Sequence, residues 1–129
     1  MRILVCGGRT YNNRELLYGV LDSQLRLFLK PLSLSEKIYN PFYIIQGGAN
    51  GADKLAKEWA GSRGCTVENH PANWDKYGKA AGFIRNQQML DEGKPDLVIA
   101  FKGGNGAADM IKRSKRAGIE IIEVNNEIL

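Results

Sequence analysis

Three apolar runs in this chain each end in a pair of glycines: ILVCGGRT at 3–10, YIIQGGANGAD at 43–53 and VIAFKGGNGAAD at 98–109. A short β-rich run followed by a glycine turn and a helix-like segment predicts a strand, a tight loop and a helix. Glycine lets the chain turn sharply and lets a ligand approach the backbone closely. Unpaired amides at the start of each following helix attract phosphate. Three such loops predict one anionic ligand that is held from several sides.

The rest of the sequence continues this alternation. We expect strands at 2–6, 42–46, 65–69, 96–101 and 119–124, and helices at 13–29, 51–62, 78–92 and 105–117. Near-continuous apolar strands that alternate with helices indicate a parallel sheet covered on both faces. Right-handed crossovers then allow the strand order 3-2-1-4-5, a Rossmann-like, doubly wound α/β fold. In that order the glycine pairs follow three neighbouring strands and meet beyond their carboxyl ends.

The size and charge of the chain limit what else it can be. With 129 residues we expect one domain, 1–129, in which 30–41 is a connector loop bracketed by Pro31 and Pro41. A net charge of +4 permits an anionic ligand without requiring nucleic acid. No apolar stretch approaches the roughly 18 residues of a membrane span. We therefore expect a cytoplasmic location and no membrane partner.

The cysteines and the single histidine predict neither a disulfide nor a metal site. Cys6 and Cys65 lie in apolar strand segments, where a thiol is usually a small core residue. If another strand separates theirs, the backbones lie roughly 10 Å apart, beyond disulfide reach. His70 is the only histidine, and no Cys-x-x-Cys spacing is present. We expect no metal and no cofactor.

Four segments carry a family pattern: GGRTY, GGANGADKLAKEWA, HPANWDKYGKAAGFIRNQQM and IAFKGGNGAADMIKRSKRAGI. Together they resemble the YspA-like, cpYpsA-related branch of the SLOG superfamily, which also contains the Lonely-guy phosphoribohydrolases and the DprA/Smf proteins. The part AGFIRNQQM is the most specific. The resemblance implies a Rossmann-like sheet that binds nucleotides or nucleotide-derived ligands, often as a homodimer.

The resemblance transfers unevenly to individual residues. The segment GGNGAAD resembles the superfamily's G-G-x-G-T-x-x-E phosphate loop, with Gly103, Gly104 and Gly106 in place. The threonine position is Ala107, and the catalytic glutamate position of the Lonely-guy enzymes falls on Met110. Because a methionine cannot orient water or stabilise an oxocarbenium ion, the hydrolase mechanism does not transfer directly.

Candidate ligand-binding residues lie in the glycine loops and around the third helix. They are Gly7, Gly8, Arg9, Gly47, Gly48, Gly51, Asp53, Trp74, Arg85, Asn86, Gly103, Gly104, Asn105 and Gly106. Arg9 and Arg85 could bind phosphate as bidentate donors, and Trp74 could stack on a base. Ordinary surface or packing roles are the competing interpretation for each of them.

Asp53 and Asp109 are the carboxylates attached to the glycine loops and the two weak candidates for catalysis. For Asp53 a helix-dipole role is the alternative. Asp109 is next to the glutamate position, but one step along a helix turns it about 100° away.

Three functions remain open. The first is a module that senses or sequesters a nucleotide-derived ligand such as phosphoribose or ADP-ribose. The second is a hydrolase or transferase of nucleotide N-glycosidic bonds, which needs a carboxylate near the anomeric carbon. The third is DprA-like binding of single-stranded DNA, supported by the mild positive charge of the chain and by loop aromatics. We favour the binding module because the catalytic glutamate is absent, and we do not favour nucleic acid.

Overall fold

The structure of the protein is a computed structural model, and it describes residues 1–28 and 42–124. It forms a five-stranded parallel sheet in the order β3-β2-β1-β4-β5, as predicted. The strands are β1 (Arg2–Cys6), β2 (Tyr43–Gln46), β3 (Thr66–Asn69), β4 (Leu97–Ala100) and β5 (Glu120–Glu123). The predicted connector 30–41 lies outside the described residues.

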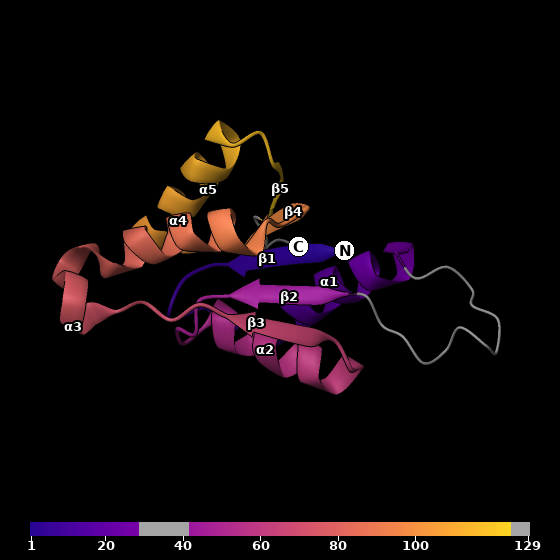
Figure 1. Cartoon of the computed structure of the whole chain (residues 1–129). Coiled ribbons are helices and arrows are strands. Elements are labelled where there is room, and N and C mark those ends of the chain that lie inside the picture. The colour runs from indigo at the N-terminus through magenta and orange to yellow at the C-terminus, as the bar shows by residue number, and fades with distance from the viewer. Residues whose placement is uncertain (29–41, 125–129) are drawn as a thin grey trace.

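Helices cover both faces of this sheet (Figure 1). They are α1 (Arg14–Phe28), α2 (Ala52–Arg63), α3 (Trp74–Tyr77), α4 (Ala81–Gly93) and α5 (Asn105–Arg116), with the short 3-10 helix η2 (Gly78–Ala80) before α4. Figure 1 shows α4 and α5 on one side of the strands and α2 on the other, with α3 beyond the strands' carboxyl ends. The fold is therefore the predicted doubly wound α/β arrangement.

The two-residue period of the strands divides the core into two layers. Ile3 and Val5 of β1 point to the face covered by α1 and α2, where the indole of Trp59 is fully buried. Leu4 and Cys6 point to the opposite face and pack against α4 and α5. Cys65 belongs to the first layer, and β2 lies between β1 and the strand that follows Cys65, which is the separation we expected of the two cysteines.

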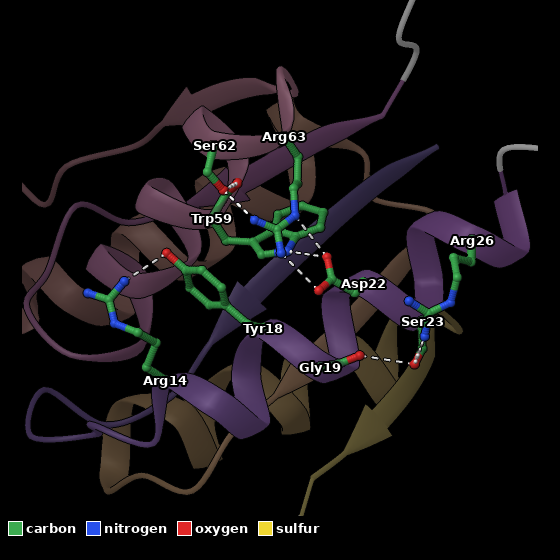
Figure 2. Close-up of polar contacts among 9 residues, drawn as sticks. All are labelled: Arg14, Tyr18, Gly19, Asp22, Ser23, Arg26, Trp59, Ser62 and Arg63. Carbon is green, nitrogen blue, oxygen red and sulfur yellow. Dashed lines mark hydrogen bonds and ion pairs between the residues drawn. The ribbon is translucent and has the colours of Figure 1, made fainter.

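A polar cluster joins α1 to α2 at the surface of the first layer (Figure 2). The Asp22 carboxylate of α1 accepts hydrogen bonds from the indole Nε1 of Trp59 and from Nε and Nη2 of Arg63, each at 2.9 Å. The Arg63 guanidinium also lies over the Tyr18 ring, 5.4 Å from its centroid. These contacts fix the register of the two helices.

Asn13 caps α1, since its Oδ1 accepts a hydrogen bond from the amide of Leu16 at 3.1 Å. One expected boundary was wrong, because we expected the third helix to begin at residue 78. Helical structure begins earlier, at Trp74, because the Asn73 side chain accepts from the Lys76 amide at 3.1 Å and caps α3.

Within residues 1–28 and 42–124, every helix is too short or too polar to pass through a bilayer.

Candidate functional site

A cavity of about 810 Å³ opens beyond the carboxyl ends of β1 and β4, where the strand order reverses. Ligands bind at this position in open α/β sheets. Residues from the first and third glycine loops, α2 and the α3–α4 region line it. They are Cys6, Gly7, Gly8, Arg9, Thr10, Tyr11, Asn12, Asn13, Ala49, Asp53, Trp74, Lys79, Gly82, Phe83, Arg85, Asn86, Met89, Lys102, Gly103, Gly104, Asn105, Gly106 and Ala107.

Most of the predicted site residues are brought together here, and a minority are not. Those in the lining are Gly7, Gly8, Arg9, Asp53, Trp74, Arg85, Asn86, Gly103, Gly104, Asn105 and Gly106. Gly47, Gly48, Gly51 and Asp109 are outside the lining. The four that are excluded all have structural contacts, which are described below.

The second glycine loop is already filled by side chains of the protein. One oxygen of Asp53, Oδ2, accepts hydrogen bonds from the amides of Gly47 and Ala49, both at 3.2 Å. The Gly48 amide donates to Oε1 of Gln46 at 2.5 Å. A carboxylate and a carboxamide thus occupy the positions at which we expected a ligand anion. This loop contributes Asp53 and Ala49 to the cavity rather than its own amides.

Gly8 is the junction at which the three loops meet. Its amide donates to the Lys102 carbonyl at 3.0 Å, and its own carbonyl accepts from the amide of Ala52 at 3.2 Å. A Cβ on Gly51 would overlap the Gly8 carbonyl, and Gly51 also has a φ of +76°. A Cβ on Gly103 would overlap the Gly8 amide nitrogen. These glycines are required for the loops to approach one another.

The third loop presents a helix start to the cavity. Gly104 is the N-cap of α5 and supplies no side chain to its first amides. A Cβ at Gly104 or at Gly106 would meet no other atom within 4 Å. Since the amides at a helix N-terminus carry partial positive charge, this end of α5 suits a phosphate.

Arg85 of α4 brings a cation into the cavity wall beneath these loops. Its Nη1 donates to the Gly47 carbonyl at 2.7 Å, and its Nε donates to Oδ1 of Asn86 at 3.2 Å. Burial lowers the pKa of Arg85, while the negative charge of Asp53 acts in the opposite direction. An arginine remains charged under these conditions. Its hydrogen-bond acceptors among the described residues are neutral, so it can bind an additional anion.

Burial also raises the pKa values of two groups that line the cavity, Asp53 and Cys6. It raises the pKa of Asp53, against the hydrogen bonds from Ala49 and Gly47 and the charge of Arg85. It raises the pKa of the Cys6 thiol to about 12, and the charge of Asp53 adds to that effect. Burial therefore favours the protonated thiol of Cys6 at neutral pH.

Aromatic and basic side chains lie at the cavity mouth. Trp74 is 48% exposed and Phe83 is 40% exposed, and both line the cavity. The Arg9 guanidinium lies over the Trp74 ring, 5.1 Å from its centroid. With Lys79 and Lys102, the lining contains four cationic residues and, among the described residues, a single carboxylate.

The catalytic candidates are arranged unfavourably for hydrolysis. Met110, at the glutamate position implied by the family resemblance, is fully buried in the second core layer. Asp109 is bound to Asn86 and Arg113 and does not line the cavity. The Asp53 carboxylate does line it, but two backbone amides bind its Oδ2.

Several cavity residues were missed by sequence reasoning, among them Lys79, Gly82, Phe83 and Lys102. Lys102 precedes the third glycine pair, so its place in the loop was a usable signal. Phe83 fits the apolar spacing of the helix expected at 78–92, and that spacing gave no sign that the side chain would line a cavity.

Comparisons with known proteins identify the family to which the chain is similar. The model of a family described as YspA, cpYpsA-related SLOG family matches residues 1–77, which include the first two glycine loops and Trp74. The Gene 61 protein of Mycobacterium phage D29 is 32% identical over 133 residues. That alignment spans 98% of this chain and 98% of the phage protein, so it includes Arg85 and the third loop. The name of the phage protein states no activity.

Proposed function

The chain belongs to the YspA, cpYpsA-related SLOG family, and on that basis we propose that it binds a small nucleotide-derived ligand in the cavity beyond β1 and β4. The ligand class is a phosphate ester of a nucleoside or ribose, such as phosphoribose or ADP-ribose. The protein acts as a sensor of this ligand or as a sink for it.

The observation that carries this proposal is the environment of Arg85. A partly buried guanidinium with neutral hydrogen-bond acceptors has lost part of its hydration without gaining an ion pair among the described residues. A phosphate would provide that counter-charge with bidentate geometry. The N-terminus of α5 and the side chain of Arg9 line the same cavity. The exposed Trp74 and Phe83 supply flat apolar surface for a base.

The test measures binding and chemistry separately. Purified protein is titrated with AMP, ADP-ribose, NAD and cyclic AMP by calorimetry, and free base is followed by chromatography in parallel. We expect saturable binding of at least one phosphate ester without release of base. Failure of all four compounds to bind at millimolar concentration would contradict the proposal.

Arg85→Ala provides the sharper arm of this test. Loss of a charge-assisted hydrogen bond to phosphate is worth about 1.5–3 kcal/mol, so affinity should fall roughly 10- to 100-fold. Arg14→Ala is the matched control, because Arg14 is an arginine of α1 that pairs with Glu58 at 2.9 Å and does not line the cavity. Equal affinity in the Arg85→Ala and Arg14→Ala proteins would remove Arg85 from the site.

Hydrolysis of the N-glycosidic bond is the second candidate function. Asp53 supports it, because it is the carboxylate of the lining and burial raises its pKa, as in acid catalysts. Base release that disappears in Asp53→Asn would favour this activity over a sensor or sink. Binding without any base release would exclude it for the compounds tested.

A further inference from the structure

A chain of polar contacts leads from Arg85 out of the cavity to the surface of α5. Arg85 Nε donates to Asn86 Oδ1 at 3.2 Å, and Asn86 Nδ2 donates to Asp109 Oδ2 at 3.0 Å. The same Asp109 oxygen accepts from Arg113 Nε at 2.7 Å. Asp109 is thus two contacts away from the cavity cation although it does not line the cavity itself.

The donors and acceptors around Asn86 in this series of contacts allow only one orientation of its side-chain amide. Its Nδ2 has two acceptors, the Asp109 carboxylate and the Gly106 carbonyl at 3.1 Å. Its Oδ1 has the Arg85 Nε as a donor. A reversed amide would place its oxygen against two acceptors and its NH₂ against a cation, and Asn86 is only 4% exposed, so water cannot compensate.

We infer that Asp109 is a positioning residue for the anion site, acting through Asn86 on Arg85. The charged acceptor of Asp109 acts with the Gly106 carbonyl to hold the amide in the orientation that offers Oδ1 to Arg85, and the Gly47 carbonyl holds the guanidinium from its other side. Arg113 in turn fixes Asp109, so this basic residue of α5 has a structural partner. This inference rests on the proposed function, since Arg85 is assigned to the ligand there.

The competing explanation is that Asp109 only ties α5 to α4. In that case, removing the Asp109 side chain would lower the free energy of unfolding. Any loss of ligand affinity would follow only from looser packing of α5 on α4. A positioning role differs from this because the effect of Asp109 on affinity must pass through the Arg85 side chain.

A double-mutant cycle separates the two explanations. The affinity for ADP-ribose is measured for the wild type, Asp109→Ala, Arg85→Ala and the double variant. We expect Asp109→Ala to weaken binding about tenfold when Arg85 is present and less than twofold when Arg85 is absent. Asp109→Asn keeps an oxygen acceptor and should recover most of the affinity. An equal loss in both backgrounds, or no loss in either, would overturn the inference.

Glu58→Ala is the matched control for these variants. It removes a carboxylate that, like Asp109, pairs with an arginine; here the partner is Arg14 Nη2 at 2.9 Å, on the α1–α2 side of the molecule. Its ADP-ribose affinity should equal that of the wild type. A tenfold loss there would show that any broken ion pair impairs the site, and would also overturn the inference.

A ligand-free readout keeps this inference separate from the proposed function. In ¹⁵N NMR spectra, the Nε–H of Arg85, assigned with Arg85→Lys, should exchange slowly with water in the wild type and in Asp109→Asn. In Asp109→Ala it should exchange quickly or vanish. An unchanged signal in Asp109→Ala would overturn the inference even if ADP-ribose binds. If the wild type binds no ADP-ribose, that result counts against the proposed function, and the Nε–H signal still decides whether Asp109 orders Arg85.

Discussion

At the scale of single residues, the glycines of the loops have two different physical roles. Gly103 and Gly51 are positions where a side chain would collide with the backbone of Gly8. Gly104 and Gly106 face open space within the folded chain. The first role concerns folding, and the second concerns access of a ligand to the backbone, so substitutions at the two kinds of position should separate them.

Gly104→Val and Gly103→Ala form a matched pair for this purpose. We expect Gly104→Val to unfold within a few degrees of the wild type, because no protein atom opposes its side chain, while affinity for ADP-ribose falls at least tenfold. Gly103→Ala should lower the free energy of unfolding by about 1–3 kcal/mol, because the Gly8 backbone must shift. Thermal unfolding and calorimetry measure the two effects. Wild-type affinity in folded Gly104→Val would argue against close backbone contact with the ligand.

Asp53 gives a prediction about pH. Because burial raises its pKa above the ordinary 3.8, the native state holds its proton more tightly than the unfolded chain does. The contribution of this group to stability therefore falls as pH rises from about 3.8 through the raised native pKa. Asp53→Asn keeps an oxygen for the Gly47 and Ala49 amides but does not ionise. In urea titrations, the free energy of unfolding of Asp53→Asn relative to the wild type should increase over that pH range. A difference that does not change with pH would contradict the raised pKa of Asp53.

At the scale of elements, the α1–α2 pair depends on Asp22, which Figure 2 shows joined by dashed lines to Trp59 and Arg63. The Trp59 ring is fully buried, so its indole N–H has little access to other acceptors. Removing Asp22 leaves that donor and the Arg63 guanidinium without the carboxylate. The contact is remote from the cavity lining, so its effect should be on stability alone.

We expect Asp22→Ala to lower the free energy of unfolding by about 2 kcal/mol at pH 7, in line with the cost of an unsatisfied buried donor. Hydrogen bonds from Arg63, followed by that from Trp59, lower the pKa of Asp22. Its stabilisation is therefore complete above about 3.8, the ordinary value, and is lost as pH falls through the lowered native pKa. Denaturant titrations at pH 7 and pH 2.5 should show the difference from the wild type shrinking at the lower pH.

Glu58→Ala serves as the control, since it removes the more exposed Arg14–Glu58 pair between the same helices. A surface pair of this kind contributes about 0–1 kcal/mol. If Asp22→Ala were no more destabilising than Glu58→Ala, the cluster would not be what holds α1 against α2.

At the scale of the whole molecule, the cavity joins both layers of the fold. Asp53 comes from α2 on one face of the sheet, whereas Arg85 and Asn105 come from α4 and α5 on the other. A ligand that contacts all of them links the two layers. Four cations against one carboxylate also give the cavity a positive field, beyond the net charge of +4 of the chain.

This field predicts a preference for charged ligands and a dependence on salt. We expect AMP to bind at least ten times more tightly than adenosine, and AMP binding to weaken as sodium chloride rises from 50 to 500 mM. At a ligand concentration of 100 Kd, AMP should stabilise the native state by about 2.7 kcal/mol, which raises the midpoint of thermal unfolding by several degrees. Equal affinity for adenosine would contradict a phosphate site.

Oligonucleotides test the remaining alternative. A short single-stranded oligonucleotide that binds in a salt-sensitive manner, and less well to Lys112→Glu, would support DNA binding. Lys112 is suited to this test because it is exposed, whereas Arg113 of the same helix is occupied by Asp109 and Gln87.

The sequence by itself determined the sheet, its strand order and the meeting of the first and third glycine loops. These features depend on short-range patterns, namely apolar runs of strand length, glycine turns and helical spacing, together with the general handedness of crossovers. The same patterns placed Arg9 and the glycines of the third loop beyond the carboxyl ends of the strands, whereas Arg85 was chosen from the family resemblance.

Only the tertiary structure decided which groups satisfy one another. The amides of the second loop are bound by Asp53 and Gln46, so a loop with a ligand-like sequence is closed by the chain's own oxygens. Asp109 meets Asn86 across 23 residues of sequence, and this contact gives it a role that its position in the motif did not suggest. Such pairings depend on how α4 and α5 pack on the sheet, and no local pattern encodes the distance between two side chains on different helices.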